Sequence, residues 1–341
     1  MPIITVGDRY QDVWIAAVLA TAMGAINAFL LAKLAGLFRG RTVLGFMEDL
    51  GAGVSAKVVA FIFTVFSVHM ASITLRDFAE LMVTSFYQET PLIVFIVVMA
   101  VLAYWLAYMG IEVTARVAQF VFPLIIGGIV LLNLSSLSLG GAENMFPLIE
   151  KGVSPIVRGG ITHWAFFADV AIWFLLIPHL NSSVKNYNFL PLSVLASGLL
   201  LVFTVFSIVL GIGNRIAVLR IYPYLTLLEE ISLVEFIERV EGFFLIIWVA
   251  SNFLKIVLFL YAGSISAGHL FRLGDHRAVL LPLMIIAVNL SVLLFDNYQQ
   301  LRYFFRPEVY APSAAIIQLG IPAYITVLWL FRSRSADRMA D

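Results

Sequence analysis

Cysteine is absent from this chain of 341 residues, and charged residues are scarce. Without cysteine there is no disulfide framework, no thiolate nucleophile and no cysteine-based metal site. Charged residues make up 12% of the chain, with 21 basic and 21 acidic side chains, whereas a soluble domain carries about 25%. No block of like charge indicates a nucleic-acid partner, so we expect none.

The sequence also lacks the short motifs of the common enzyme classes. HExxH, GxSxG and Walker-type loops do not occur, and the five histidines are scattered along the chain. We therefore predict neither catalysis nor a bound metal, and the sequence indicates no cofactor.

Long apolar runs dominate what is present. Hydrophobic residues make up 62% of the chain, and the mean hydropathy is +0.99. A helix needs about 20 mostly apolar residues to cross a bilayer. Nine stretches qualify: 13–37, 57–86, 91–108, 111–134, 155–180, 189–213, 237–262, 278–295 and 312–332. Because the alternation of barrel strands is missing, we predict an all-α, polytopic helical membrane protein that forms a single transmembrane domain.

Basic residues set the predicted orientation, because cytoplasmic loops are enriched in lysine and arginine. Ten of them fall on one side: Lys33, Arg39, Arg41, Arg116, Lys185, Arg272, Arg277, Arg332, Arg334 and Arg338. The opposite side has nearly as many basic residues but most of the acids. We expect the first side to be cytoplasmic, with the C-terminus inside and the N-terminus outside.

The first stretch has a small residue at every fourth position. These residues are Ala16, Ala20, Gly24, Ala28, Ala32 and Gly36. Small residues let the backbones of neighbouring helices approach closely within a membrane. We interpret the stripe as a packing seam.

The stretch 155–180 carries more polar groups than a membrane anchor needs. Polar and ionisable groups at membrane depth are expensive and mark a site by default. Glycine also weakens a helix and lets other groups approach its backbone. We predict an interrupted helix that lines a polar cavity, with five candidate binding residues: Gly160, Thr162, His163, Phe166 and Asp169.

Two further stretches place polar residues on one helix face. In 57–86, His69, Ser72 and Arg76 recur at a spacing of three to four. Arg76 and Glu80 are also placed for an i,i+4 ion pair. This face is either part of a binding cavity or a structural ion pair near the outer end of the helix.

In 237–262, the polar face is formed by Trp248, Ser251, Asn252 and Lys255. Lys255 lies too deep to reach the interface easily, so it needs an acceptor or it loses its proton. Asp169 lies at a similar depth. The two form either a static buried pair or a pair that titrates during transport.

The sequence resembles the B subunit of bacterial spore germinant receptors, the spore germination permease family. The resemblance rests on QDVWIAAVLA, RTVLGFMEDLG, LRDFAELM, GIEVTARVAQFVFPL, FPLIEKGVSPIVRGG and VEFIERVEGFFLIIWVASNFLKIVLFLY, which occur in the family's order. That family looks like the amino acid–polyamine–organocation transporter superfamily. The resemblance implies ten helices in two inverted repeats, each opening with a helix that is interrupted at the substrate site.

The chain departs from this pattern in two places. QDVW resembles the start of the family's second helix, so we expect residues 1–134 to be an incomplete first repeat and 155–332 to be the second. Either the start is misassigned or truncated, or the protein is genuinely shortened. Residues 165–169 read Ala-Phe-Phe-Ala-Asp where the family tends to have a proline and a glycine before an acid. We therefore expect either a helix break at Gly159-Gly160 or an altered site.

The resemblance implies a receptor subunit that binds a small germinant, such as an amino acid, in the bacterial plasma membrane or spore inner membrane. It also implies two partners, a membrane subunit with soluble domains and a lipoprotein subunit. Two alternatives remain open: an amino-acid permease of the same superfamily, and an ion or water conduit.

Overall fold

The computed structural model describes residues 11–38, 40–180, 187–234 and 240–337, and all regular secondary structure within them is helical. Nine helical segments of this part are long and apolar enough to cross a membrane: Val13–Phe38, Gly53–Phe86, Leu92–Met109, Ile111–Leu139, Val153–His179, Phe189–Ala217, Val240–Leu270, His276–Leu293 and Pro307–Arg332. The predicted all-α class and the nine spans are confirmed.

The helices run in the order α1 (Val13–Ala35), α2 (Val43–Asp49), α3 (Gly53–Leu81), α4 (Leu92–Met109), α5 (Ile111–Ser136), α6 (Val153–Ala165), α7 (Trp173–Leu176), α8 (Phe189–Ala217), α9 (Pro223–Val234), α10 (Val240–Leu270), α11 (Leu280–Leu293), α12 (Tyr298–Phe304), α13 (Pro307–Ala315) and α14 (Ile321–Asp337). The 3-10 segment η5 (Phe166–Ile172) lies between α6 and α7, and the π-helical turn η8 (Ile316–Gly320) lies between α13 and α14.

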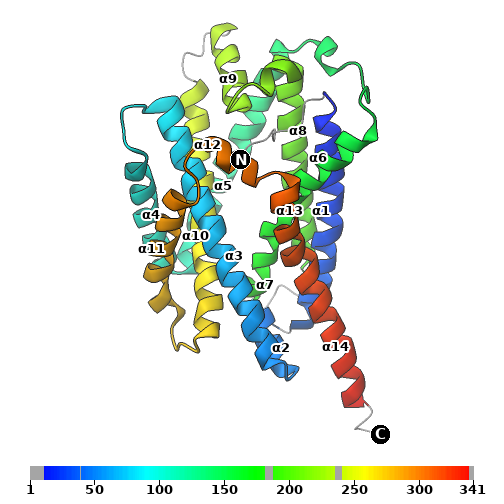
Figure 1. Ribbon diagram of the computed structural model, residues 1–341, viewed down its shortest axis with the longest axis vertical. Coiled ribbons are helices and arrows are strands. Elements are labelled where there is room, and N and C mark those ends of the chain that lie inside the picture. Colours follow the sequence, from blue (N-terminus) through cyan, green and yellow to red (C-terminus); the bar gives the residue numbers. More distant parts are fainter. Residues whose placement is uncertain (1–10, 39, 181–186, 235–239, 338–341) are drawn as a thin grey trace.

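The bundle has two groups of helices (Figure 1). On one side α3 packs along α10, with α4 and α11 against them; on the other, α1 packs along α6 and α8. α13 packs against α6, and α5 contacts both α10 and α8. The short helices α9 and α12 lie at one end of the bundle, and α2 and the end of α14 lie at the opposite end.

The small-residue stripe of α1 is the packing seam that the sequence predicts. Ala16, Ala20, Gly24, Ala28 and Ala32 are buried, whereas Gly36 is exposed. A Cβ at position 24 would lie 2.6 Å from Cδ2 of Phe167, so only glycine leaves room for this ring of η5. The seam therefore sets how closely α1 approaches the interrupted span.

Polar side chains join helices of the bundle interior. The Asn27 side chain of α1 donates a hydrogen bond of 2.9 Å to Gln318 of η8, and Asn133 of α5 donates one of the same length to Thr204 of α8. All four side chains are buried. In lipid such bonds fix helix pairs, because hydrocarbon offers no alternative partner.

Enlarging a residue of the α1 seam is expected to destabilise the bundle. Ala20 is fully buried, whereas Ala22 on the same helix is exposed. Because overpacking a filled interior costs about 1–3 kcal/mol, Ala20→Leu should lower the free energy of unfolding by that amount, and Ala22→Leu should leave it unchanged. Thermal denaturation of the two purified variants in one detergent measures the difference; equal losses would contradict the seam.

Candidate functional site

The fifth span is interrupted at η5, where the α-helix changes to a 3-10 helix from Phe166 to Ile172. A 3-10 stretch in mid-helix often marks a functional hinge or a sequence under strain. Aromatic, β-branched and aspartate residues rank low in helix propensity, and they make up most of η5: Phe166, Phe167, Asp169, Val170 and Ile172.

The expected break at Gly159-Gly160 is wrong. Both glycines lie inside the continuous helix α6 and are buried. A Cβ at position 160 would lie 2.8 Å from Cδ2 of Leu19 in α1. Gly160 therefore serves the close approach of α6 to α1 rather than a break in the backbone.

Asp169 and Lys255 form an ion pair between η5 and α10. Lys255 Nζ lies 2.8 Å from Asp169 Oδ2, and it also lies 5.6 Å from the ring centre of Phe259, one turn further along α10. About a quarter of each charged side chain stays accessible, 23% for Lys255 and 25% for Asp169. Asp169 Oδ1 is buried and accepts no hydrogen bond from the described residues. The pair is therefore half-satisfied and open to a further donor.

Aromatic rings pack beside this pair. The Phe166 ring lies 5.2 Å from that of Phe305 and 5.6 Å from that of Tyr310. Phe304 contacts Phe305 and Tyr310, and it also meets the ring of His69 on α3 at 5.2 Å. These rings connect η5 with α3, α12 and α13.

Phe304, Phe305 and Tyr310 are site candidates that the sequence reading missed. They lie in α12, in α13 and between them, in the connection before the predicted last span. Tyr310 is buried. The aromatic run RYFFRPEVY at 302–310 is the signal that could have indicated them, because large rings in a connection seldom stay in water without a packing partner.

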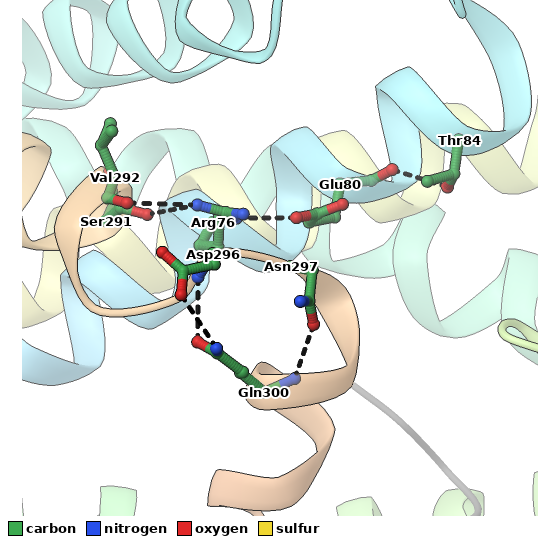
Figure 2. A network of polar contacts seen from close by, with 8 residues as sticks. All are labelled: Arg76, Glu80, Thr84, Ser291, Val292, Asp296, Asn297 and Gln300. Carbon is green, nitrogen blue, oxygen red and sulfur yellow. Dashed lines mark hydrogen bonds and ion pairs between the residues drawn. The ribbon is translucent and has the colours of Figure 1, made fainter.

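The predicted Arg76–Glu80 pair is confirmed, and it is buried (Figure 2). Arg76 Nε lies 2.8 Å from Glu80 Oε1, and the two side chains are only 7% and 9% exposed. Arg76 Nη1 also donates to the carbonyls of Ser291 and Val292 at the end of α11, at 3.2 and 3.5 Å. Arg76 thus joins α3 to α11 through Nη1 while Nε holds Glu80.

The remaining candidates on α3 and α6 bond to their own helix. The Ser72 hydroxyl donates to the His69 carbonyl at 2.7 Å, and the Thr162 hydroxyl donates to the Arg158 carbonyl at 3.0 Å. His163 is buried, with Nδ1 2.8 Å from the Gly159 carbonyl oxygen. A hydroxyl that donates in this way still has lone pairs to offer a ligand.

Two of the candidates on α10 also donate hydrogen bonds to carbonyls of their own helix. Ser251 donates to the Ile247 carbonyl and Asn252 to the Trp248 carbonyl, at 2.7 and 2.8 Å. The Trp248 ring packs against Phe244 and Tyr222, toward the α9 end of the bundle. The structure therefore pairs Asp169 with Lys255, and it links Phe166 to His69 through the rings of Tyr310 and Phe304. It places Trp248 in a second aromatic group.

Tyr222 and Tyr298 extend this second group outside the membrane spans. Their ring centres lie 5.3 Å apart. Burial, together with the charge of Asp77, raises the pKa of both phenols well above the ordinary value. Both hydroxyls therefore stay protonated and neutral at every physiological pH.

Comparisons with known proteins agree on the family and the fold. A family model described as "Spore germination protein" matches residues 1–300. The chain is 24% identical over 296 residues to spore germination protein KB of Bacillus subtilis (strain 168), covering 85% of this chain and 79% of that protein. It is 23% identical over 275 residues to spore germination protein YndE of the same strain, covering 79% and 74%.

Two solved structures share the architecture. MhsT in complex with L-phenylalanine superposes with a TM-score of 0.61 at 13% identity, covering 96% of this chain and 95% of that one. Mhp1, a nucleobase-cation-symport-1 family transporter, gives a TM-score of 0.55 at 14% identity, covering 93% and 74%. At these identities the likeness is one of fold.

Removing the Arg76 charge should strongly destabilise the protein. Breaking a buried ion pair by removing one partner costs about 3–5 kcal/mol, so Arg76→Gln should lower the free energy of unfolding by that amount. The matched control is Arg116→Gln, which removes the same kind of i,i+4 pair where the side chains are 75% and 78% exposed. Its loss should stay below about 1 kcal/mol. Thermal denaturation compares them, and similar losses would show that the α3–α11 junction does not depend on Arg76.

Proposed function

Because the chain belongs to the spore germination protein family, we propose that it is the membrane subunit of a germinant receptor and that an amino acid binds at Asp169 and Lys255. The long apolar helices of the described residues and the family support an integral membrane protein of the spore inner membrane. Residues 1–134 would form an incomplete first repeat and residues 155–332 the second, with η5 in the opening span of the second.

The observation that carries the proposal is the unpartnered carboxylate oxygen of Asp169. One oxygen accepts from Lys255 at 2.8 Å, and the other is buried without a partner among the described residues. A buried, unpaired acceptor is costly, and a ligand ammonium group removes that cost. Lys255 in turn offers a cation to a ligand carboxylate. An adjacent acid and base inside a membrane bundle therefore match a zwitterion.

The surroundings of the pair support an amino acid over a larger ligand. The rings of Phe166, Phe305 and Tyr310 provide apolar surface beside the charges. The His69 ring, which contacts Phe304, adds a polar group at the edge of this aromatic cluster. Interrupted helices in transporter folds place small substrates near the bilayer midplane. The solved relative MhsT is described in complex with L-phenylalanine, a ligand of this class.

The other candidate residues would act around this centre. Thr162, Ser72, Ser251 and Asn252 each keep an acceptor free for a ligand or for water, while Gly160, His163, Arg76 and Trp248 would hold the walls in place. Binding would change the contacts of η5 and pass the signal to a membrane subunit with soluble domains and a lipoprotein subunit.

Transport of an amino acid is the second candidate function. The partial accessibility of the Asp169–Lys255 pair, 25% and 23%, favours it, because a reachable ion pair can exchange protons as its partners separate. The fold shared with transporters also supports it.

Neutralising either member of the pair should weaken the response to the germinant. A hydrogen bond to a charged group contributes about 1.5–3 kcal/mol, which corresponds to roughly a tenfold to hundredfold higher half-maximal germinant concentration. We expect this shift for Asp169→Asn and Lys255→Gln in spores that carry the variant as the sole receptor. The matched control is Glu112→Gln in the exposed Glu112–Arg116 pair. Wild-type sensitivity in both site variants across all amino acids would refute this placement.

Purified protein in liposomes should separate a receptor from a permease. A receptor is expected to bind the labelled amino acid saturably without accumulating it, and Asp169→Asn should lose that binding. A permease would accumulate the label at a rate that depends on pH. The N-acetylated analogue lacks the ammonium charge and the carboxamide analogue lacks the carboxylate charge, so they test the two charges separately. Wild-type protein should bind the free amino acid more tightly than either analogue. If both analogues bind as tightly as the free amino acid, recognition of a zwitterion is contradicted.

A further inference from the structure

A basic cavity lies at the opposite end of the bundle from α9 and α12. It measures about 660 Å³ and is bounded by the α2–α3 turn, the first turns of α3, the end of α10 and α14. Three cations line it, Lys57, Arg272 and Arg332, and no acidic residue does. In the described part of the chain none of the three forms an ion pair. Three exposed cations that line one cavity without a carboxylate are suited to an anion.

Arg272 is held in a conformation that favours glycine. It has a φ of +54° and follows the last turn of α10. Its N–H donates to the His269 carbonyl at 3.2 Å, and the next N–H, of Leu273, donates to the Gly268 carbonyl at 2.9 Å. This is the hydrogen-bond pattern of a helix end at which glycine is the usual residue. Arginine at this position is therefore not explained by the helix end itself.

The second guanidinium, that of Arg332, packs against the α2–α3 turn. Gly51 has a φ of +69°, and Arg332 Nη1 occupies the space that a Cβ at position 51 would fill. Arg332 comes from α14, so the three cations that line the cavity come from separate elements of the chain. A guanidinium is suited to phosphate, because its planar fork donates two parallel hydrogen bonds.

The cavity opens onto an apolar face of α3. Val54 and Val58 line it and are 83% and 54% exposed. Phe61 and Val65 continue the same face along the span and are also exposed. Tyr324 and Leu328 of α14 add apolar surface to the lining. A soluble phosphate compound has no apolar part to bury against this surface, whereas the acyl chain of a lipid has one.

We propose that this cavity binds an anionic phospholipid of the cytoplasmic leaflet. The phosphate diester lies among Lys57, Arg272 and Arg332, and an acyl chain follows the α3 face from Val54 to Val65. Basic pockets between transmembrane helices on the cytoplasmic side are suited to anionic lipid headgroups. A bound lipid holds together the ends of α3, α10 and α14.

Binding of phosphatidylglycerol to the purified full-length chain tests the site. Lipid retained by the protein is counted by native mass spectrometry, and the midpoint of thermal unfolding is measured with phosphatidylglycerol or phosphatidylcholine added. Each basic residue near an anionic lipid is worth about fivefold in affinity. We expect roughly that loss of phosphatidylglycerol affinity for Arg272→Gly, Lys57→Gln and Arg332→Gln, and no change for phosphatidylcholine. Lys33→Gln is the matched control, because Lys33 is exposed in the last turn of α1 at the same end.

Arg272→Gly separates binding from folding. Glycine relieves the positive φ, so the lipid-free variant should unfold at the wild-type temperature or above it while binding less phosphatidylglycerol. Unchanged binding in all three site variants would overturn the proposal. Glycerol 3-phosphate distinguishes a soluble ligand: if it stabilises the protein as much as phosphatidylglycerol at equal concentration, the site takes a free phosphate and the lipid assignment is wrong.

Discussion

Hydrocarbon offers no hydrogen-bond partner, so each polar group within the bundle has to find one in the protein. This constraint explains which helices touch. Asn27 reaches Gln318 and thereby joins α1 to η8. Arg76 reaches Glu80 and two carbonyls of α11. The polar residues of the spans thus act first as junctions, and the apolar surfaces pack around the positions that these junctions allow.

The Arg76–Glu80 and Asp169–Lys255 ion pairs differ in how completely they are satisfied. Arg76 donates to protein acceptors through Nε and Nη1, and its pair with Glu80 is almost fully buried. Asp169 pairs with Lys255 through one oxygen only, and the pair is partly accessible. A satisfied pair stabilises a junction, whereas an incompletely satisfied one next to a 3-10 segment is the arrangement expected of a ligand site. Polarity at membrane depth is therefore not enough to identify the site.

α10 connects the centre of the bundle with the end that carries the basic cavity. Lys255 lies within this helix, and Arg272 directly follows its last turn. The proposed amino-acid site and the proposed lipid site therefore share one rigid element. If both proposals hold, a movement of α10 that accompanies a change at Asp169 would also move one wall of the basic cavity and would couple the bound lipid to the amino-acid site.

Properties that depend on local spacing were determined by the sequence alone. Apolar runs set nine spans, small residues at every fourth position set the α1 seam, and a spacing of four set the Arg76–Glu80 pair. Tertiary structure decided the rest. A glycine in the sequence shows that the backbone can bend or be approached closely, but it does not show which of the two occurs. In the structure Gly160 serves helix packing, and the interruption of the span lies at η5. The association of Phe166 with Phe305 and Tyr310, and of Lys57 with Arg272 and Arg332, joins residues far apart in the chain. Such contacts follow from how helices pack, which no local pattern encodes.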